Sequence, residues 1–308
     1  MNEVYYIIKK KIKELKESTW LLGICEEGFD DLKKNRIRWI SNGEYEGKKW
    51  FADPFILDYN DNKIHLLVEE FDYKIHRGRI AKLTIDHNTW TVKDCKIILD
   101  LPTHLSFPLI WRDGMDVFVC PENYASGGWN LYRYNSEAEK LEFIKQIVDI
   151  KLTDAIIYHE GNDYWLLSTY VPKPNGHELT IWHGTSLFGK YQETQRVSFN
   201  ENIGRNAGML FHKNGKLIRP AQESNFSYGH SISFQEVTIQ GKKFSFKESY
   251  RFYSPHKKYN EGTHTYNTLG NMSVIDVKGW RYPIAAKVIR FIGRFLMVLH
   301  LKRQYRPK

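Results

Sequence analysis

Residues 204–229 read GRNAGMLFHKNGKLIRPAQESNFSYG, and this stretch decides the fold. It holds two apolar runs of strand length, residues 208–211 and 216–218, separated by a short turn that ends in Asn214-Gly215. An Asn-Gly pair between apolar runs is the strongest short-range signal for a β-hairpin, because both turn residues must accept a positive φ. The stretch therefore predicts a hairpin, and the polar residues at its strand ends, where binding groups usually sit, form a candidate binding set.

The same unit recurs along the chain, which indicates a repeat architecture. Each copy opens on a short strand that passes from polar to apolar residues, turns at Asn, Asp or Gly, and returns on a second apolar strand. Four-stranded units with a period of about 50 residues are typical of a β-propeller. The sequence therefore predicts an all-β, five-bladed β-propeller with short flanking helices; in a two-sheet sandwich, the alternative, the strand period is nearer about 10 residues. The five opening strands begin at residues 52–55, 106–109, 153–156, 205–208 and 263–266.

The fifth unit has too few strands of its own, which bears on the domain organisation. We expect a strand from residues 20–50 to complete this unit and to close the ring. The chain then divides into an N-terminal helix and linker at 1–35, the propeller at 36–279 and a basic amphipathic C-terminal helix at 280–308.

Both ends of the chain are basic, whereas the propeller body is not. The whole chain has a net charge of +9, and eight Lys or Arg with no acid stand between residues 281 and 308. The near-neutral body argues against nucleic acid as a partner. In the tail, Lys287, Arg290 and Arg294 share one helical face, opposite Ile, Val, Phe and Leu. Such a helix carries too much charge to span a bilayer but suits a membrane surface; packing against the propeller is the alternative.

Cysteine usage and the N-terminus predict a cytoplasmic location. The three cysteines are odd in number and have no CxxC spacing, which argues against a disulfide framework or a structural zinc site. The N-terminus has no uninterrupted apolar stretch followed by a small-residue cleavage site, which a secretory signal requires. Together with the two basic ends, these features predict a protein that is peripheral on the inner face of the plasma membrane.

In a propeller the innermost strands line a central channel, so the starts of the opening strands meet at one mouth. Asp53 and Asp154 occupy such starts, and Glu122 ends a return strand. Paired carboxylates act as acid, base or nucleophile in glycosyl chemistry, so we predict Asp53, Glu122 and Asp154 as catalytic residues. Capping of hairpins is the alternative role for the aspartates. However, a polar residue recurs at this position in four units but differs in type from one unit to the next. A purely architectural repeat tends to keep one residue type.

Other polar residues near the same strand ends predict a substrate-binding set. Arg205 and Arg219 have no acid nearby on their own strands, so we predict that they bind phosphate or carboxylate; pairing with an acid of a neighbouring blade is the alternative. His264 is open to three roles, as general base, metal ligand or core histidine. The sequence predicts no metal site and identifies no cofactor. The full binding set is Glu70, Arg205, Asn206, Arg219, Gln222, Tyr228, His264 and Asn267.

Six motifs, taken in order, resemble a known family. They are ADPF at 52–55, HLLVEE at 65–70, SFPLIW at 106–111, TDAIIYH at 153–159, RNAGMLFHKNGKLIRPAQES at 205–224 and GTHTYN at 262–267. The set resembles the propeller domain at the N-terminus of plant glucosamine inositolphosphorylceramide transferase and its bacterial relatives, which often accompany genes for surface-polysaccharide assembly. That domain is in turn similar to the five-bladed propellers of glycoside hydrolase family 43.

The similarity to the hydrolases implies roles for the three carboxylates. Asp53 matches the base, Asp154 matches an acid that orients the base or tunes its pKa, and Glu122 is the best match for the proton donor, at a different strand position. The resemblance implies a protein that handles sugars.

Two further runs shift the expected activity away from simple hydrolysis. RPAQ and HTYN, which carry Arg219, Gln222, His264 and Asn267, resemble the plant family and not the hydrolases. We therefore predict glycosyl transfer in the assembly of a surface polysaccharide or glycolipid at the cytoplasmic face of the membrane. The partners are then an activated sugar donor, a glycan or glycolipid acceptor, and a membrane surface contacted by both basic ends. A glycoside hydrolase similar to family 43 and a non-catalytic glycan-binding scaffold are the alternatives.

Overall fold

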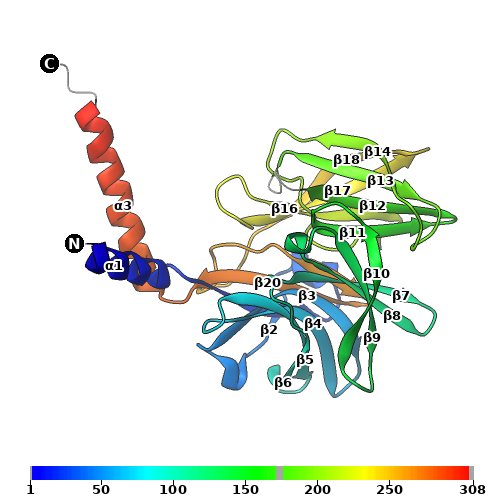
Figure 1. The fold of residues 1–308 in the computed structure, drawn as a ribbon, viewed down its shortest axis with the longest axis horizontal. Coiled ribbons are helices and arrows are strands. Elements are labelled where there is room, and N and C mark those ends of the chain that lie inside the picture. Colours follow the sequence, from blue (N-terminus) through cyan, green and yellow to red (C-terminus); the bar gives the residue numbers. More distant parts are fainter. Residues whose placement is uncertain (1, 171–175, 305–308) are drawn as a thin grey trace.

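The computed structural model describes residues 2–170 and 176–304, and most of them form five four-stranded antiparallel sheets. The sheets are arranged as the blades of a five-bladed β-propeller, which confirms the fold predicted from the repeat (Figure 1). Blades 1 to 4 each take four consecutive strands, and blade 5 combines strands from both ends of the chain.

The strand bounds follow the predicted repeat in the first three units, but the opening strands predicted at 205–208 and 263–266 begin later, at Phe211 and Tyr266. Blade 1 comprises β3 (Lys49–Tyr59), β4 (Lys63–Asp72), β5 (Arg77–Asp86) and β6 (Thr91–Leu99). Blade 2 comprises β7 (Ser106–Asp113), β8 (Asp116–Glu122), β9 (Trp129–Asn135) and β10 (Lys140–Val148). Blade 3 comprises β11 (Leu152–Glu160), β12 (Asp163–Tyr170), β13 (Glu178–Gly184) and β14 (Gln192–Ser198). Blade 4 comprises β15 (Phe211–Lys213), β16 (Lys216–Glu223), β17 (Ser231–Gln240) and β18 (Lys243–Phe252).

The N-terminus closes the ring, as the short fifth unit predicted. Blade 5 has the order β19 (Tyr266–Leu269), β20 (Met272–Trp280), β1 (Ser18–Cys25) and β2 (Arg38–Trp39). Strand β1 pairs with the whole of β20, from Ser18 opposite Trp280 to Cys25 opposite Ser273. The propeller therefore begins at Ser18, earlier than the boundary predicted at residue 36, because β1 covers a long apolar edge that would otherwise stay unpaired.

The core lies between neighbouring blades, and the sequence of the second strands reflects this. In β4, Leu66, Leu67 and Val68 are all fully buried. A strand that is covered on both faces reads as a continuous apolar run, whereas a strand with one solvated face alternates. The apolar run of β4 ends at Glu69 and Glu70, which are also buried.

The hairpin that predicted the fold joins β15 to β16. Its turn residues Asn214 and Gly215 have φ values of 51° and 73°, the left-handed conformation expected for an Asn-Gly turn. Residues 216 to 223 then form a strand that is buried from Leu217 onward.

Among the described residues, three α-helices and two short 3₁₀ turns lie outside the blades. They are α1 (Asn2–Leu15), α2 (Phe29–Lys33), α3 (Pro283–Gln304), η1 (Gly43–Tyr45) and η2 (Tyr124–Ser126). Helices α1 and α3 stand on one side of the propeller, and α3 projects away from it (Figure 1). None of the helices in the described residues is long and apolar enough to cross a membrane.

One face of α3 exposes apolar side chains to solvent. Five of them, spaced along one helical face, are exposed: Ile284, Val288, Phe291, Ile292 and Phe295. Of the predicted basic face, Arg290 instead forms an ion pair with Glu261 at 2.6 Å and lies over the ring of Trp280. The side chain of Arg294 and residues 305–308 lie outside the described part of the chain.

Candidate functional site

A backbone kink repeats in the opening strands of blades 1 to 3. Asp53, Phe107 and Asp154 all have positive φ values, of 51°, 43° and 45°, and each lies in a register shift of its strand. A non-glycine residue in this conformation costs about 1 to 2 kcal/mol, so something must hold it there.

In each of the three blades a carboxylate from a neighbouring blade accepts the N–H of the kinked residue. Asp276 Oδ2 accepts from Asp53 N at 3.0 Å, and Asp53 Oδ2 accepts from Phe107 N at 3.1 Å. Glu122 Oε2 accepts from Asp154 N at 2.8 Å. Because the donor and the acceptor come from adjacent blades, these bonds tie neighbouring blades together.

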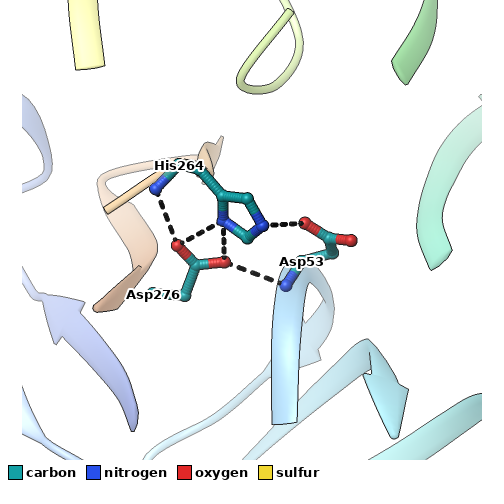
Figure 2. Close-up of side chains that lie close together, drawn as sticks. All are labelled: Asp53, His264 and Asp276. Carbon is teal, nitrogen blue, oxygen red and sulfur yellow. Dashed lines mark hydrogen bonds and ion pairs between the residues drawn. The ribbon is translucent and has the colours of Figure 1, made fainter. Parts of the chain in front are cut away.

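Asp53, His264 and Asp276 form the first half of the site (Figure 2). His264 Nδ1 lies 2.8 Å from Asp276 Oδ2, and His264 Nε2 lies 3.5 Å from Asp53 Oδ1. Thr265 Oγ1 donates to the same Asp53 oxygen at 2.8 Å. The imidazole is thus held between two carboxylates, one from blade 1 and one from blade 5.

The electrostatics of this half follow from burial and from the opposed charges. Burial raises the pKa of Asp53 to about 7, against the attraction of His264 and with a further contribution from Glu69. Burial lowers the pKa of His264, but the carboxylates of Asp276 and Asp53 outweigh it and raise that pKa to about 9. At neutral pH the imidazole is therefore protonated, and Asp53 is poised to bind or release a proton.

Within the described residues, Asp53, His264 and Asp276 are the group of potential metal ligands with suitable spacing. The two oxygens of Asp276 already accept from four groups: Asp53 N, His264 N, Thr265 N and His264 Nδ1. A cation bound here would displace these donors, and it would require a neutral imidazole. The donor set fits a hydrogen-bonded relay better than a metal centre.

Glu122, Asp154 and Arg205 form the second half of the site. Arg205 Nε donates to Asp154 Oδ2, and Arg205 Nη2 lies 3.7 Å from Glu122 Oε2. Burial and the charge of Asp154 raise the pKa of Glu122 to about 8, against the attraction of Arg205. Glu122 is therefore mostly protonated at neutral pH. Arg205 pairs with acids of the preceding blades, the alternative left open by the sequence.

The two halves lie at the same mouth of the channel. The charge of Asp154 contributes to the raised pKa values of both Asp53 and His264. The ring of Tyr228 connects the halves, with its centroid 5.3 Å from that of His264 and 5.5 Å from the guanidinium of Arg205. The structure thus brings together six residues predicted from sequence: Asp53, Glu122, Asp154, Arg205, Tyr228 and His264.

Two charged residues of the predicted binding set lie elsewhere. Glu70 is fully buried and forms ion pairs with Arg79 at 2.9 Å and Lys49 at 2.6 Å, so it belongs to the interior of blade 1. Arg219 is fully buried in blade 4, and it donates to Asn206 Oδ1, Gln235 Oε1 and the carbonyls of residues 203 and 204. This corrects the expectation that Arg219 binds an anionic substrate, because its donors are used to hold the chain that leads into the blade.

Two of the three predicted amides, Asn206 and Asn267, are structural in the same way. Asn206 Nδ2 donates to the carbonyls of Asp154 and Leu167 in blade 3, at 2.8 and 2.9 Å. Asn267 Nδ2 donates to the Pro54 carbonyl of blade 1 at 3.0 Å, and its Oδ1 accepts from Met209 N at 2.9 Å. Both side chains join neighbouring blades and are buried, which corrects their assignment as substrate-binding groups. Gln222, also buried, accepts a 3.4 Å hydrogen bond from Ser224 Oγ within its own loop.

Several residues of the mouth were not predicted from the sequence. Glu69, the neighbour of Glu70, lies 3.2 Å from His104 Nε2. Burial lowers the pKa of His104, but Glu69, Glu122 and Asp53 together raise it, so His104 faces the same carboxylates. Trp20, from the ring-closing strand, stacks on His264 with ring centroids 4.1 Å apart. Asp276 could have been identified from the sequence, since it is a lone acid inside the apolar strand 273–277.

Comparison with protein families gives a match over most of the propeller. Residues 40–278 match the family described as glucosamine inositolphosphorylceramide transferase 1, N-terminal. The Arabidopsis thaliana protein of that name is 29% identical over 204 residues, which are 63% of this chain and 26% of the relative. The protein of Oryza sativa subsp. japonica is 26% identical over 195 residues, 60% of this chain and 26% of the relative. The match therefore spans about a quarter of the length of these relatives.

Solved structures with a similar fold are glycoside hydrolases. Bacteroides ovatus xyloglucan PUL GH43B superposes with a TM-score of 0.51 and 13% identity, over 69% of this chain and 47% of that one. The α-L-arabinofuranosidase from Podospora anserina in complex with cellotriose gives a TM-score of 0.50 and 10% identity, over 74% of this chain and 79% of that one. At such low identity the similarity concerns the fold alone.

Proposed function

This chain belongs to the family of glucosamine inositolphosphorylceramide transferase 1 N-terminal domains, and from that premise we propose that it is a carbohydrate-active propeller that catalyses glycosyl transfer. The substrates are an activated sugar donor and a glycan or glycolipid acceptor, and the product is part of a surface polysaccharide or glycolipid. Fold alone does not determine a reaction, so the proposal depends on the mouth.

The observation that carries the proposal is the pair of buried carboxyl groups, with Asp53 beside His264 and Glu122 beside Asp154 and Arg205. Burial raises the pKa of both groups, to about 8 for Glu122 and about 7 for Asp53, so each can exchange a proton near neutral pH. A protonated acid and an ionised base at one mouth are the groups that glycosyl chemistry needs.

In the proposed step, ionised Asp53 takes the proton of an acceptor hydroxyl. The oxygen of that hydroxyl forms the new bond to the anomeric carbon of the donor sugar, and the bond from this carbon to the leaving oxygen breaks with its electron pair. Glu122 gives its proton to the leaving oxygen. Asp154 and Arg205 hold Glu122 in place through the contacts described above.

The terminal helices support a membrane-bound acceptor. Ser18 pairs with Trp280, so α1 and α3 both leave blade 5 at the end where Trp20 stacks on His264. Docking of the exposed apolar face of α3 on the cytoplasmic face of the plasma membrane would bring the mouth close to lipid-linked acceptors.

Transfer is tested with purified full chain, a panel of nucleotide-activated sugars and lipid-linked acceptors, and mass spectrometry as the readout. We expect a product whose formation is lost in Asp53→Asn and Glu122→Gln and kept in Asp61→Asn, a matched change in the exposed hairpin turn of blade 1. Release of free sugar from a glycan would instead identify a hydrolase. Glycan binding without either transfer or release of free sugar would identify a non-catalytic scaffold.

The scaffold alternative has its own supporting observation. Each of Asp53, Glu122 and Asp276 accepts a main-chain N–H of a neighbouring blade, which is a reason for an acid at these positions that needs no reaction. On that view Asp53→Asn lowers the melting temperature but leaves glycan affinity unchanged, and the same variants distinguish the two functions.

A further inference from the structure

Exposed aromatic side chains gather beside the mouth, on blade 4. Phe226 and Tyr228 lie in the loop between β16 and β17, His230 ends that loop, and Tyr253 follows β18. The exposed fractions are 85% for Phe226, 52% for Tyr253 and 42% for Tyr228. Folding buries aromatic rings, so three exposed rings in one place are not explained by the core. We call Phe226, Tyr228, His230 and Tyr253 the aromatic platform.

The platform has two sets of ring contacts, one of which reaches the catalytic groups. The ring of Tyr228 lies 5.3 Å from that of His264, and the ring of His230 lies 5.3 Å from Phe226 and 5.4 Å from Tyr253. Two cations, Arg205 and Lys278, lie over the ring of Tyr228 at 5.5 and 5.4 Å. The loop between β16 and β17 therefore carries rings of both sets.

The loop that carries the platform is held in place by buried groups. Glu223, 1% exposed, accepts from His230 Nδ1 at 2.8 Å, from Ser231 Oγ at 2.8 Å and from Asn225 N at 2.6 Å. Burial acts to raise the pKa of Glu223, but these hydrogen bonds outweigh it and lower the pKa. The ionised carboxylate fixes His230 with Nδ1 inward, so its Nε2 is directed away from Glu223.

The other end of the loop is fixed by blade 5. Lys278 Nζ donates to the Tyr228 carbonyl at 3.1 Å, and Thr263 N donates to the Gly229 carbonyl at 2.7 Å. Gly229 has a φ of 62°, and a Cβ there would lie 2.8 Å from Cβ of His264. The loop thus packs directly on the site and presents its rings without needing to reorganise.

From this arrangement we propose that the aromatic platform binds a sugar chain, the glycan part of a substrate whose reacting end enters the mouth. This rests on the proposed function. A sugar ring has an apolar C–H face and a polar hydroxyl edge. The platform offers matching groups, since it combines the exposed rings of Phe226 and Tyr253 with the hydroxyls of its two tyrosines and Nε2 of His230. Two nearby cations and an imidazole make it less suited to insertion into acyl chains, the other use of exposed aromatics.

Direct binding tests the platform without depending on catalysis. The probes are cello-, chito- and β-1,3-galacto-hexasaccharides and the corresponding monosaccharides, titrated calorimetrically into the full chain. At least one hexasaccharide is expected to bind. Phe226→Ala and Tyr253→Ala each weaken its binding about three- to tenfold, the effect of removing one stacked ring, and leave monosaccharide binding unchanged. Phe143→Ala, 60% exposed on β10 of blade 2, is the matched control and changes neither.

Each other outcome overturns the proposal. Absence of binding to every hexasaccharide, or equal affinity in Phe226→Ala, Tyr253→Ala and Phe143→Ala, removes the platform as a glycan site. Phosphatidylcholine vesicles test the competing use: if the platform variants lose vesicle binding and keep glycan binding, the rings are a membrane anchor. If only the proposed transfer fails, the outcome is different: no product forms with any donor, but Phe226→Ala still weakens glycan binding.

Discussion

At the scale of single residues, Asp276 organises the mouth. Its fully buried carboxylate accepts from main-chain N–H groups of Asp53, His264 and Thr265 and from the His264 ring. In Asp276→Asn an amide N–H₂ would face those donors and leave the His264 cation without its main partner. We expect the free energy of unfolding to fall by about 3 kcal/mol, typical for breaking a buried pair.

Urea denaturation checks this expectation against Asp116→Asn. Asp116 is about half exposed and lies 3.5 Å from Arg133, so its loss is expected to cost less than about 1 kcal/mol. Equal stability of the two variants would contradict the role given to Asp276.

The pKa values at the mouth also predict how stability depends on pH. The pKa values of Asp53, Glu122 and His264 are raised from 3.8, 4.5 and 6.5 to about 7, 8 and 9. The folded protein thus binds more protons than the unfolded chain between these limits. The stabilising contribution is complete below the unfolded pKa values and is lost as pH rises through the folded ones. We expect the melting temperature to fall from pH 5 to pH 9.

Glu122→Gln isolates one part of this dependence. The variant cannot bind the extra proton, so its melting temperature is expected to decline less steeply between about pH 5 and 8. Glu160→Gln, an exposed change in a hairpin of blade 3, is the control with an unchanged slope. A wild-type melting temperature that is flat or rises over this range would refute the assigned protonation states.

Residue identity was predictable at the mouth where the repeat marked a position, as with Asp53 and Asp154. Glu69 and Glu70 stand together at the end of a predicted strand, and because consecutive strand residues point to opposite faces, the sequence does not show which of them faces the mouth. The bulge after Ala52 shifts the register in the facing strand, and a sequence pattern does not reveal a bulge. Arg219 was misassigned because its partners, Asn206 and Gln235, are neutral and lie on other segments.

At the scale of elements, the ring-closing strand is the least obvious part of the fold. Trp20, Leu22 and Ile24 of β1 are at most 4% exposed, and burial of each such side chain contributes about 1.5 to 3 kcal/mol. Deletion of residues 1–26 is expected to leave β20 as an open edge and to give an aggregated or unfolded chain. Deletion of residues 1–15 removes only α1 and is expected to leave the melting temperature nearly unchanged.

Circular dichroism and size-exclusion chromatography of the two deletions check this difference. A stable monomer after deletion of 1–26 would show that the propeller folds without β1, and it would contradict this expectation. The strand was predictable only as a requirement of ring closure, because its partner, β20, lies more than 240 residues away in sequence. By contrast, the Asn214-Gly215 hairpin is local, and its position and turn conformation followed from sequence.

At the scale of the whole molecule, the separation of charge between body and ends was visible in the sequence, but the orientation of the helices was not. A helical pattern identifies an apolar face without indicating what covers it. The structure leaves Ile284, Phe291 and Phe295 exposed, which removes the alternative that α3 packs this face on the propeller. It also engages Arg290 with Glu261, so fewer of the tail cations than counted in the sequence face outward.

The last prediction concerns membrane docking through α3. Each outward Lys or Arg near an anionic leaflet contributes about 1 kcal/mol, and the exposed apolar face adds to this. The full chain is expected to float with phosphatidylserine-containing liposomes, whereas a variant ending at Tyr282 is expected not to float. This end point keeps the β20–β1 pairing and the 2.7 Å contact of Arg281 with Glu17.

Lys287→Glu should weaken flotation at low salt only, since the Debye length falls to about 3 Å at 1 M salt. Phe291→Ser with Phe295→Ser should weaken it at every salt concentration. Equal flotation of the shortened variant, or a dimer of the full chain that dissociates in Phe291→Ser and never floats, would show that α3 serves another partner.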